Sequence, residues 1–578
     1  MNHEKTINSI LADSLIVMEK GHSPFEIAIR TMKVSVCDAF RKSGAVVPIT
    51  FTPGTKVLEP NGEIADSFPR SIAASRNRIL SAGEALPTKE TGKRVVVLFS
   101  GGPAAGGHNV VAGLKQILGH ENTLLGIKAG PKGLLKGEMF EITDEHVEQI
   151  MNTGGFNFMG TDRTKIEKPE DIDKVKTVCR EQNIDAIVII GGDDSNTNAA
   201  LLAETLFSDV KEDGSGVQVI GVPKTIDGDL QRGDELPISF GFDTATKIYA
   251  EEVGNLLRDS SSSLKYWHFI RLMGRSASHV TLEVALQTHP TIALISEEIR
   301  ERNITLAEIV DSISKTVIER AKNGLNYGVV LVPEGLIEFI PGFTTMIDDL
   351  NDKMAQFKDE LNGKNIREQL VFMYSKLTQY HGELLESLPD PIRYTLMADR
   401  DQHGNLPVSK IATETMLSSA VKARIKELDG NTKFETLNHF FGYEARCGAS
   451  TVFDSFYTYN LGVTAGSLIL DGHTGYMASL TDLDKGAKPL GIPITSLLDI
   501  EVRKGKPAKV IEKALVKLDS PAFIHFAARR KHWAENDLSN SPGPVQLWGP
   551  TSRQLPKTVA LNRKYHSLDF KFSTDQDG

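Results

Sequence analysis

The chain has 578 residues and carries 65 Lys and Arg against 75 Asp and Glu, which gives a formal net charge of −10. Hydrophobic residues make up 40% and charged residues 24%, and the 49 glycines and 25 prolines are an ordinary share, so a collagen-like, low-complexity or wholly disordered protein is excluded. The length corresponds to three or four domain-sized units, or to two large ones with insertions, and the acidic balance argues against a nucleic-acid partner.

Cysteine usage and the apolar runs predict the compartment. The N-terminal stretch mixes Glu4, Asp13 and Glu19 into what a signal peptide would keep apolar, and no apolar run reaches the roughly 18 residues of a membrane-spanning helix. We therefore predict a cytoplasmic protein with no membrane partner. The three cysteines lie far apart without a CxxC pair, which indicates neither a disulfide framework nor a thiolate zinc site: Cys37, Cys179 and Cys447.

Residues 1–90 show helical patterns and then a strand-like stretch punctuated by proline and glycine, so we interpret them as an N-terminal extension packed on a core. Between about residues 93 and 340, short runs rich in β-branched residues alternate with helical periodicity, as in 109–118. This pattern is typical of a parallel sheet covered by helices, so the predicted fold class is α/β. Strands are predicted at 94–99, 122–127, 185–190, 217–222, 266–272, 291–296 and 327–332.

Beyond residue 340 the β-rich alternation stops and long polar helical patterns follow. The predicted order is a 1–90 extension, a 91–340 α/β core, a 341–438 helical insertion, and a 439–578 return to the core with C-terminal helices. The basic run at 529–531 lies in a helical pattern and is interpreted as a solvated helix face. The terminal STDQDG sequence is typical of a disordered tail.

Four loops follow predicted strands, and ligands of open α/β sheets bind outside the carboxyl ends of strands. The first loop, Ser100–Gly107, lies between the strand at 94–99 and the helix at 109–118. Glycines let the backbone approach phosphate oxygens, and the following helix N-terminus favours an anion. The loop is neither a Walker A sequence nor GxGxxG, and a plain tight turn is the alternative.

The second loop, Gly191–Ser195, places Asp193 beside Asp194. Two adjacent carboxylates at a buried sheet edge repel each other, so a cation should lie close to them. Mg²⁺ is the natural candidate, because it binds one or two carboxylates together with substrate phosphates. The alternative is that the Asp194 side chain caps the next helix.

The third loop, Pro223–Asp229, contains Lys224, Asp227 and Asp229. An extended conformation would place both aspartates on one side, where one carboxylate could act as a general base and the lysine could pair with phosphate. The alternative is a turn with solvated acids. The fourth loop, Met273–Ser278, offers a glycine turn and the fixed donor fork of an arginine, and its alternative is a surface salt bridge.

Taken in order, these loops resemble the phosphofructokinases, and within them the long form of the pyrophosphate-dependent class. The matching motifs cover nearly the whole core: SGG at 100–102, GGDDS at 191–195, PKTIDGD at 223–229, KYWHFIRLMGR at 265–275, VPEG at 332–335 and GYEAR at 442–446. The resemblance implies two Rossmann-like three-layer α/β domains. It also implies a reversible, Mg²⁺-dependent phosphoryl transfer of glycolysis and gluconeogenesis, in which pyrophosphate and fructose 6-phosphate give fructose 1,6-bisphosphate and phosphate.

The resemblance also implies roles for single residues. Asp227 matches the base that takes the proton of the sugar 1-hydroxyl, Asp193 matches the Mg²⁺ ligand, and Gly102 matches a backbone contact to the donor. Lys265 and Tyr266 match positions that reach the neighbouring subunit's substrate in a homodimer. The remaining matches are to sugar or 6-phosphate contacts: Thr225, Ile226, Met273, Gly274, Arg275, Glu334, Tyr443, Glu444, Ala445 and Arg446.

Two residues indicate the phosphoryl donor. ATP-dependent relatives usually carry glycine at the positions of Asp194 and Lys224, which leaves room for the nucleotide's α-phosphate. Here the carboxylate would repel ATP, and the lysine can neutralise charge on the transferred group. The alternatives are an ATP-dependent 6-phosphofructokinase and a non-catalytic regulatory subunit of the same family, although the latter predicts loss of the base or the metal ligand.

Overall fold

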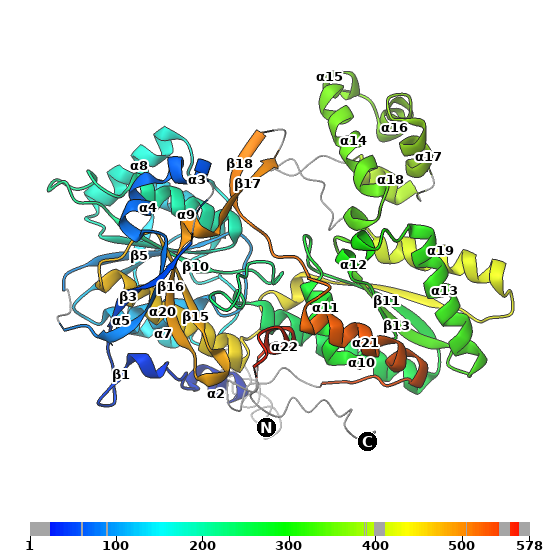
Figure 1. Cartoon of the computed structure of the whole chain (residues 1–578), viewed down its shortest axis with the longest axis horizontal. Coiled ribbons are helices and arrows are strands. Elements are labelled where there is room, and N and C mark those ends of the chain that lie inside the picture. Colours follow the sequence, from blue (N-terminus) through cyan, green and yellow to red (C-terminus); the bar gives the residue numbers. More distant parts are fainter. Residues whose placement is uncertain are drawn as a thin grey trace, which may run out of the picture.

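The computed structural model describes residues 24–58, 60, 62–87, 91–386, 388, 390–397, 411–503, 506–542 and 555–565. Two α/β lobes lie side by side, and a group of short helices stands above the second one (Figure 1). The predicted tail at 573–578 falls outside the described residues.

The first lobe contains a ten-stranded sheet with a parallel centre. Its order is β3-β4-β16-β15-β10-β9-β5-β6-β7, with β8 paired to β5. Strands β15, β10, β9, β5 and β6 run parallel, and the flanking strands are antiparallel. The strands are β3 (Ile49–Val57), β4 (Arg78–Ala85), β5 (Arg94–Ser100), β6 (Thr123–Ile127), β7 (Met139–Glu141), β8 (Thr161–Asp162), β9 (Ala186–Gly191), β10 (Gln218–Pro223), β15 (Tyr476–Thr481) and β16 (Lys488–Pro493).

Helices cover both faces of this sheet, because its central strands are apolar on both sides. In β5, Val95, Val97 and Phe99 pack in one cluster with α5 and α20, whereas Val96 and Leu98 pack in another with α8 and α9. The helices of this lobe are α2 (Pro24–Thr31), α3 (Gly62–Ser67), α4 (Pro69–Ser75), α5 (Gly107–Leu118), α6 (Gly130–Lys136), α7 (Asp144–Ile150), α8 (Pro169–Glu181), α9 (Asp193–Thr205) and α20 (Val452–Leu470).

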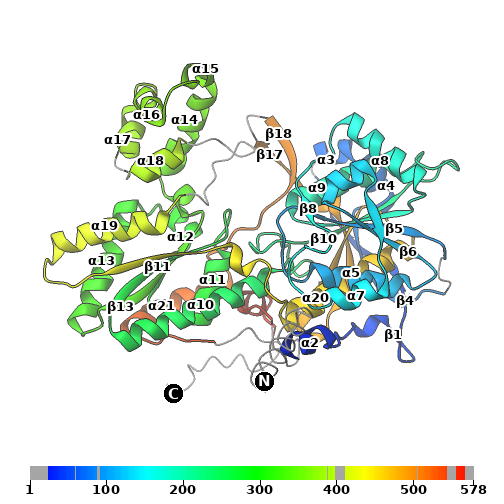
Figure 2. The same cartoon turned by 180° about the vertical axis from the view of Figure 1, so that it is seen from behind.

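The second lobe contains a four-stranded parallel sheet in the order β12-β13-β11-β14. Its strands are β11 (Tyr266–Leu272), β12 (Ile292–Ala293), β13 (Tyr327–Pro333) and β14 (Thr436–Phe441). Figure 2 shows the same sheet from behind, with helices on both of its faces. They are α10 (Phe242–Ser263), α11 (His279–Thr288), α12 (Ser296–Glu301), α13 (Leu306–Lys322), α19 (Thr413–Leu428), α21 (Pro521–Asn536) and α22 (Lys557–Asn562).

All seven predicted strands are present, and one is much shorter than expected. Of the apolar run at 291–296, only two residues pair as β12, and Ser296 already begins α12. The prediction for that stretch is therefore wrong in length, because an apolar run reports burial and cannot by itself separate a strand from a buried helix start. Within residues 1–90, β3 and β4 extend the first sheet by pairing next to β16.

The stretch 341–438 contains two kinds of element. Short helices stand together above the second lobe: α14 (Phe343–Gln356), α15 (Lys358–Leu361), α16 (Ile366–Tyr374), α17 (Gln379–Glu386) and α18 (Asp390–Leu396). By contrast, α19 packs on α13 and β11, and β14 pairs in parallel with β11. These last elements belong to the second sheet, a long-range pairing that local periodicity does not encode.

A hairpin and a connecting segment link the two lobes near the C-terminus. Strands β17 (Leu498–Arg503) and β18 (Lys506–Ile511) form an antiparallel pair beside the first lobe, and the chain then crosses to α21 on the second lobe (Figure 1). In α21, the predicted solvated basic face is only partly free in solvent. Arg530 makes a bidentate ion pair with the buried Glu298 at 2.6 and 2.8 Å.

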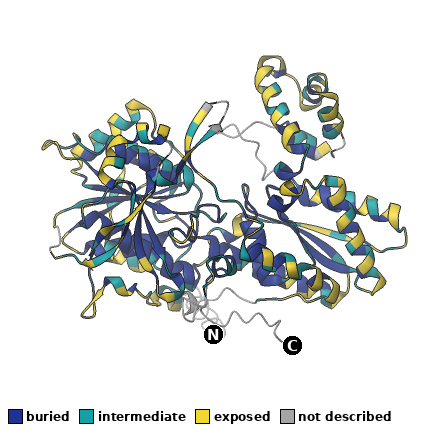
Figure 3. Cartoon of the chain, in the orientation of Figure 1, coloured by how far each residue is buried: buried dark blue, intermediate teal, exposed yellow. Residues whose placement is uncertain are grey.

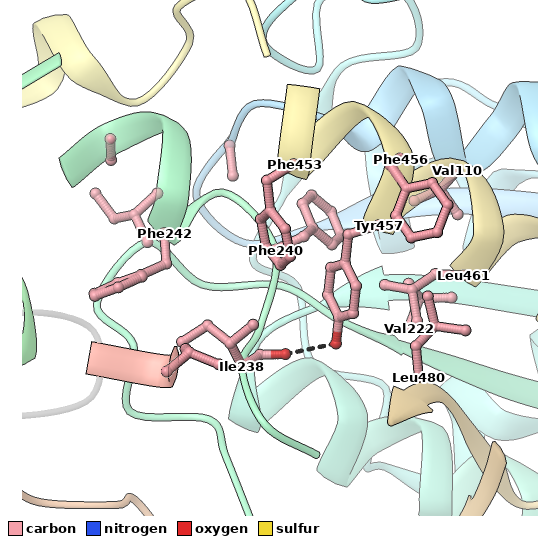
Figure 4. Close-up of a cluster of buried hydrophobic side chains, with 14 of the residues drawn as sticks. Val110, Val222, Ile238, Phe240, Phe242, Phe453, Phe456, Tyr457, Leu461 and Leu480 are labelled. Atoms are coloured by element: carbon pink, nitrogen blue, oxygen red, sulfur yellow. Dashed lines mark hydrogen bonds between the residues drawn. The ribbon is translucent and has the colours of Figure 1, made fainter. Parts of the chain in front are cut away.

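Buried residues fill the sheets and the helix faces that cover them, as Figure 3 shows. At the junction of the lobes, aromatic side chains of α20 pack on the 238–242 segment (Figure 4). There the Tyr457 hydroxyl donates to the Ile238 carbonyl at 2.6 Å, which satisfies its polar atom inside an apolar cluster. The three cysteines are unpaired, and among the described residues no helix is long and apolar enough to cross a membrane.

Candidate active site

A cavity of about 660 Å³ opens where the two lobes meet. The first-lobe wall comes from the carboxyl ends of β5, β9 and β10, and the second-lobe wall comes from those of β11 and β13. The structure therefore brings the four predicted loops together at one site. Its main polar lining residues are Ser100, Arg163, Thr164, Lys165, Asp193, Asp194, Ser195, Lys224, Thr225, Asp227, Asp229, Arg275, Ser276, Glu334, Glu338, Tyr443, Arg446, Glu501 and Lys513.

The loop after β5 needs its glycines for two different reasons. Gly101 has φ +84°, a left-handed conformation that disfavours side chains. A Cβ on Gly102 would lie only 1.8 Å from the Nη2 of Arg446. The backbone at Gly101 is fixed as well, since its N–H donates to the Asp162 carbonyl at 2.9 Å. The loop backbone therefore faces the cavity without side chains at Gly101 and Gly102, and the hydrogen bond to Asp162 fixes its position.

The loop after β9 places two aspartates at the start of α9. Asp193 and Asp194 are its first two residues, and the N-cap is Gly192 with no side-chain cap. The capping alternative for Asp194 is therefore wrong. The carboxylates face different lysines: Asp194 Oδ1 lies 3.5 Å from Lys165 Nζ, and Asp193 Oδ2 lies 3.8 Å from Lys513 Nζ.

The loop after β10 carries a buried lysine. Lys224 is 7% exposed, and its backbone N–H donates to the Gly191 carbonyl at 2.9 Å. Burial lowers the pKa of Lys224 to about 8, and the Arg446 charge adds to this, whereas Asp193 and Asp227 act in the opposite direction. The lysine can therefore lose its charge in a range close to physiological pH.

The acids of the same loop differ in exposure. The Asp227 N–H donates to Thr225 Oγ1 at 3.1 Å, which stiffens the turn, while the neighbouring Ile226 is buried in the cavity wall. Asp229 is 6% exposed, and burial raises its pKa to about 7, helped by the Asp227 charge. The turn is thus not a set of solvated acids, and that alternative is wrong.

The second-lobe wall joins the fourth loop to the end of β13. The Gly274 N–H donates to Glu334 Oε2 at 3.0 Å, and Gly274 has φ +131°. Glu334 is 1% exposed, and its Oε1 has no partner within the described part of the chain. An unsatisfied buried carboxylate oxygen is costly, so a ligand hydroxyl is a fitting partner. Met273 and Arg275 also line this wall.

The GYEAR segment is only partly in the cavity. Tyr443 and Arg446 line it, and the guanidinium lies 5.0 Å from the tyrosine ring centroid. Arg446 Nε also donates to the Pro103 carbonyl, in the loop after β5, at 3.3 Å. Glu444 instead accepts from the Gly442 N–H at 2.9 Å, and Ala445 is buried. Glu444 and Ala445 do not line the cavity.

Lys265 and Tyr266 lie away from the cavity. They stand at the amino end of β11, and Met273 follows its carboxyl end, about 20 Å away at the rise of a strand. Lys265 is exposed, with its ammonium 4.8 Å from the Tyr266 ring centroid. These two side chains therefore cannot complete this chain's own site.

The sequence-based prediction did not include several residues that line the cavity. Arg163 and Lys165 follow β8, a two-residue strand too short to give a periodic signal. Lys513 comes from the segment after β18, where no strand-to-helix turn marks it. Glu338 lies in a 3₁₀ turn, and burial raises its pKa to about 7. Only the cationic RTK triplet at 163–165 offered a usable signal.

The carboxylates fit a divalent cation only together with a substrate. In the described residues, no group of three or more His, Cys, Asp or Glu side chains could hold a metal ion. Asp193 still presents a carboxylate to the cavity. One carboxylate completed by phosphate oxygens is the arrangement in which Mg²⁺ is usually held.

Comparisons with known proteins agree with this geometry. Residues 94–469 match the family model described as phosphofructokinase. The chain is 43% identical over 509 residues to the pyrophosphate--fructose 6-phosphate 1-phosphotransferase of Porphyromonas gingivalis, covering 86% of this chain and 91% of that protein. It is 45% identical over 494 residues to the Treponema pallidum protein of the same name, covering 83% and 85%. It is 44% identical over 484 residues to subunit beta 2 from Arabidopsis thaliana, covering 81% and 82%.

Proposed function

The chain belongs to the phosphofructokinase family, and from that premise we propose that it reversibly transfers a phosphoryl group from pyrophosphate to the 1-hydroxyl of fructose 6-phosphate. The products are fructose 1,6-bisphosphate and phosphate. The observation that carries this proposal is the single cavity in which Asp194, Lys224 and Asp227 meet. Phosphoryl transfer requires a base near the acceptor hydroxyl and cations around the moving group, which Asp227 and Lys224 would supply.

Donor choice follows from the first-lobe wall. The Asp194 carboxylate lies at the start of α9 and lines the cavity. We propose that it fills the space that ATP-dependent relatives leave open for the nucleotide's α-phosphate. The Lys224 ammonium lies next to the glycine loop, because a Cβ on Gly101 would be 3.4 Å from Lys224 Nζ. A short donor can use that cation without meeting the anionic side chain.

Acceptor binding uses the second-lobe wall. We assign Asp227 as the base that receives the 1-hydroxyl proton, and Glu334 as a partner of a sugar hydroxyl through its unpaired Oε1. Thr225, Met273, Gly274 and Arg275 complete the sugar side. Arg446 supplies a cation for a phosphate, and the aromatic ring of Tyr443 lies beside it. Glu444 and Ala445 support that turn from outside the cavity.

Asp193 would hold the metal, which we propose to be Mg²⁺. The chemistry that Mg²⁺ would supply when bound is neutralisation of the negative charge on the phosphates. This chain would contribute the Asp193 carboxylate, which lines the same cavity as the glycine loop after β5. Gly102 of that loop would contact pyrophosphate through its backbone. Omission of divalent cation should therefore abolish turnover without unfolding the protein.

We further propose a homodimer whose sites are completed across the interface. Lys265 and Tyr266 lie too far from their own cavity, and the adjacent Leu264 is 60% exposed. The resemblance assigns Lys265 and Tyr266 to the neighbouring subunit's substrate, so a second copy of the chain would bring them to a site. Three free thiols fit a reducing compartment, which supports the predicted cytoplasm.

The decisive experiment measures fructose 1,6-bisphosphate formation by the purified protein with Mg²⁺ and either pyrophosphate or ATP. Turnover with pyrophosphate and little with ATP is expected. Faster turnover with ATP would identify an ATP-dependent 6-phosphofructokinase. No turnover with either donor, recovered only on adding a second subunit type, would identify a regulatory subunit.

A further inference from the structure

The segment 512–520, which connects β18 to α21, is held on both sides of the cavity. The Ala514 N–H donates to the Asp229 carbonyl at 2.8 Å, and the Ala514 carbonyl lies 2.8 Å from His279 Nε2. Further along, the Val516 N–H donates to Glu297 Oε1 at 3.0 Å. His279 and Glu297 belong to the second lobe, so the segment is a fixed bridge between the lobes.

This bridge carries Lys513 into the cavity. Lys513 Nζ donates to Ser276 Oγ at 2.8 Å, and it lies 3.8 Å from Asp193 Oδ2 and 3.9 Å from Asp229 Oδ2. Within the described chain this is the single hydrogen bond of the ammonium, which has three donors. Both carboxylates are beyond hydrogen-bond distance, so two donors remain available to a ligand.

Acidic side chains surround the Lys513 ammonium. Burial alone would lower the pKa of Lys513, but Asp193, Asp229 and Asp227 outweigh it and raise the pKa. Asp193 and Asp227 also act on the Lys224 ammonium. The candidate metal ligand and the candidate base therefore interact with two lysines, Lys224 from the loop after β10 and Lys513 from the bridge.

We propose that Lys513 is a further catalytic residue, whose ammonium contacts the phosphoryl group during its transfer. The inference rests on the proposed function. In the transfer, the bond between phosphorus and the bridging oxygen of pyrophosphate breaks, the bond from phosphorus to the sugar O1 forms, and the O1 proton moves to Asp227. Lys513 gains and loses no proton, and its ammonium balances negative charge on the transferred group, as Lys224 does from the loop after β10.

The test compares Lys513→Met and Lys513→Arg with Lys509→Met, a control at an exposed lysine of β18, four residues earlier and outside the cavity. Loss of one preorganised cation should lower kcat by about 10²- to 10³-fold in Lys513→Met. The KM values for both substrates should stay within about threefold. Lys513→Arg should regain part of kcat, and Lys509→Met should match the wild type.

Two further measurements separate a catalytic from a structural role. In Lys513→Ala, added propylammonium should raise kcat in proportion to its concentration. This rescue measurement does not depend on whether Lys513→Met folds. A loss that is fully reversed by higher Mg²⁺ concentration would mean that Lys513 only balances Asp193, and it would overturn the inference. So would a Lys513→Met kcat within threefold of the wild type. A wild type without pyrophosphate-dependent turnover would instead refute the proposed function.

Discussion

Replacement of Gly102 by alanine tests the geometry of the site most directly. The new Cβ would lie 1.8 Å from Arg446 Nη2 and 3.0 Å from its Cζ, so the guanidinium must retreat by roughly 1.5 Å to reach an ordinary contact of 3.4 Å. The backbone does not oppose the change, since Gly102 is not among the glycines with positive φ. The conflict therefore falls on the tip of one flexible side chain.

The expected result is a loss of activity without a loss of stability. A shift of about 1 Å in a positioning group costs on the order of 10²-fold, so kcat/KM with pyrophosphate should fall by about that factor, or about 2.7 kcal/mol. The thermal midpoint should move by less than about 2 °C, because the clash is relieved at a flexible tip. Gly382→Ala is the matched control, since its Cβ would meet only Tyr374 Cδ1 at 4.0 Å.

A double-mutant cycle links the effect to Arg446. If Gly102→Ala acts by displacing the guanidinium, the double variant Gly102→Ala/Arg446→Met should be no slower than Arg446→Met alone. The larger change in KM, for fructose 6-phosphate or for pyrophosphate, identifies the phosphate that the arginine holds. Additive losses, or a Gly102→Ala variant with wild-type activity, would refute the reasoning.

Three other outcomes are expected. Asp227→Ser should lower kcat by several orders of magnitude while both KM values change modestly, and near-normal turnover would remove the base assignment. The double variant Asp194→Gly/Lys224→Gly should lose pyrophosphate turnover and gain use of ATP, which paired assays with each donor would measure. Because burial lowers the pKa of Lys224 to about 8 and the charged form is needed, kcat/KM with pyrophosphate should fall above about pH 8. If a Lys224→Arg variant shows the same decrease of kcat/KM above about pH 8, the decrease comes from the titration of another group.

The sequence alone determined the central strands between residues 94 and 333, apart from the length of β12, and the loops that carry the chemistry. The run at 94–99 is apolar on both faces, a local pattern that predicts a strand covered by helices on both sides. The loops at 191–195 and 223–229 follow such strands, so their acids and Lys224 were placed at the sheet edge before any contact was known.

Tertiary structure alone decided which side chains from distant segments meet there. Arg446 lies against Gly102, and Lys513 enters from a bridge whose backbone is held by Asp229, His279 and Glu297. Periodicity reports which face of an element is buried, whereas these contacts depend on the path of the whole chain through space, and no local pattern of residues records that path.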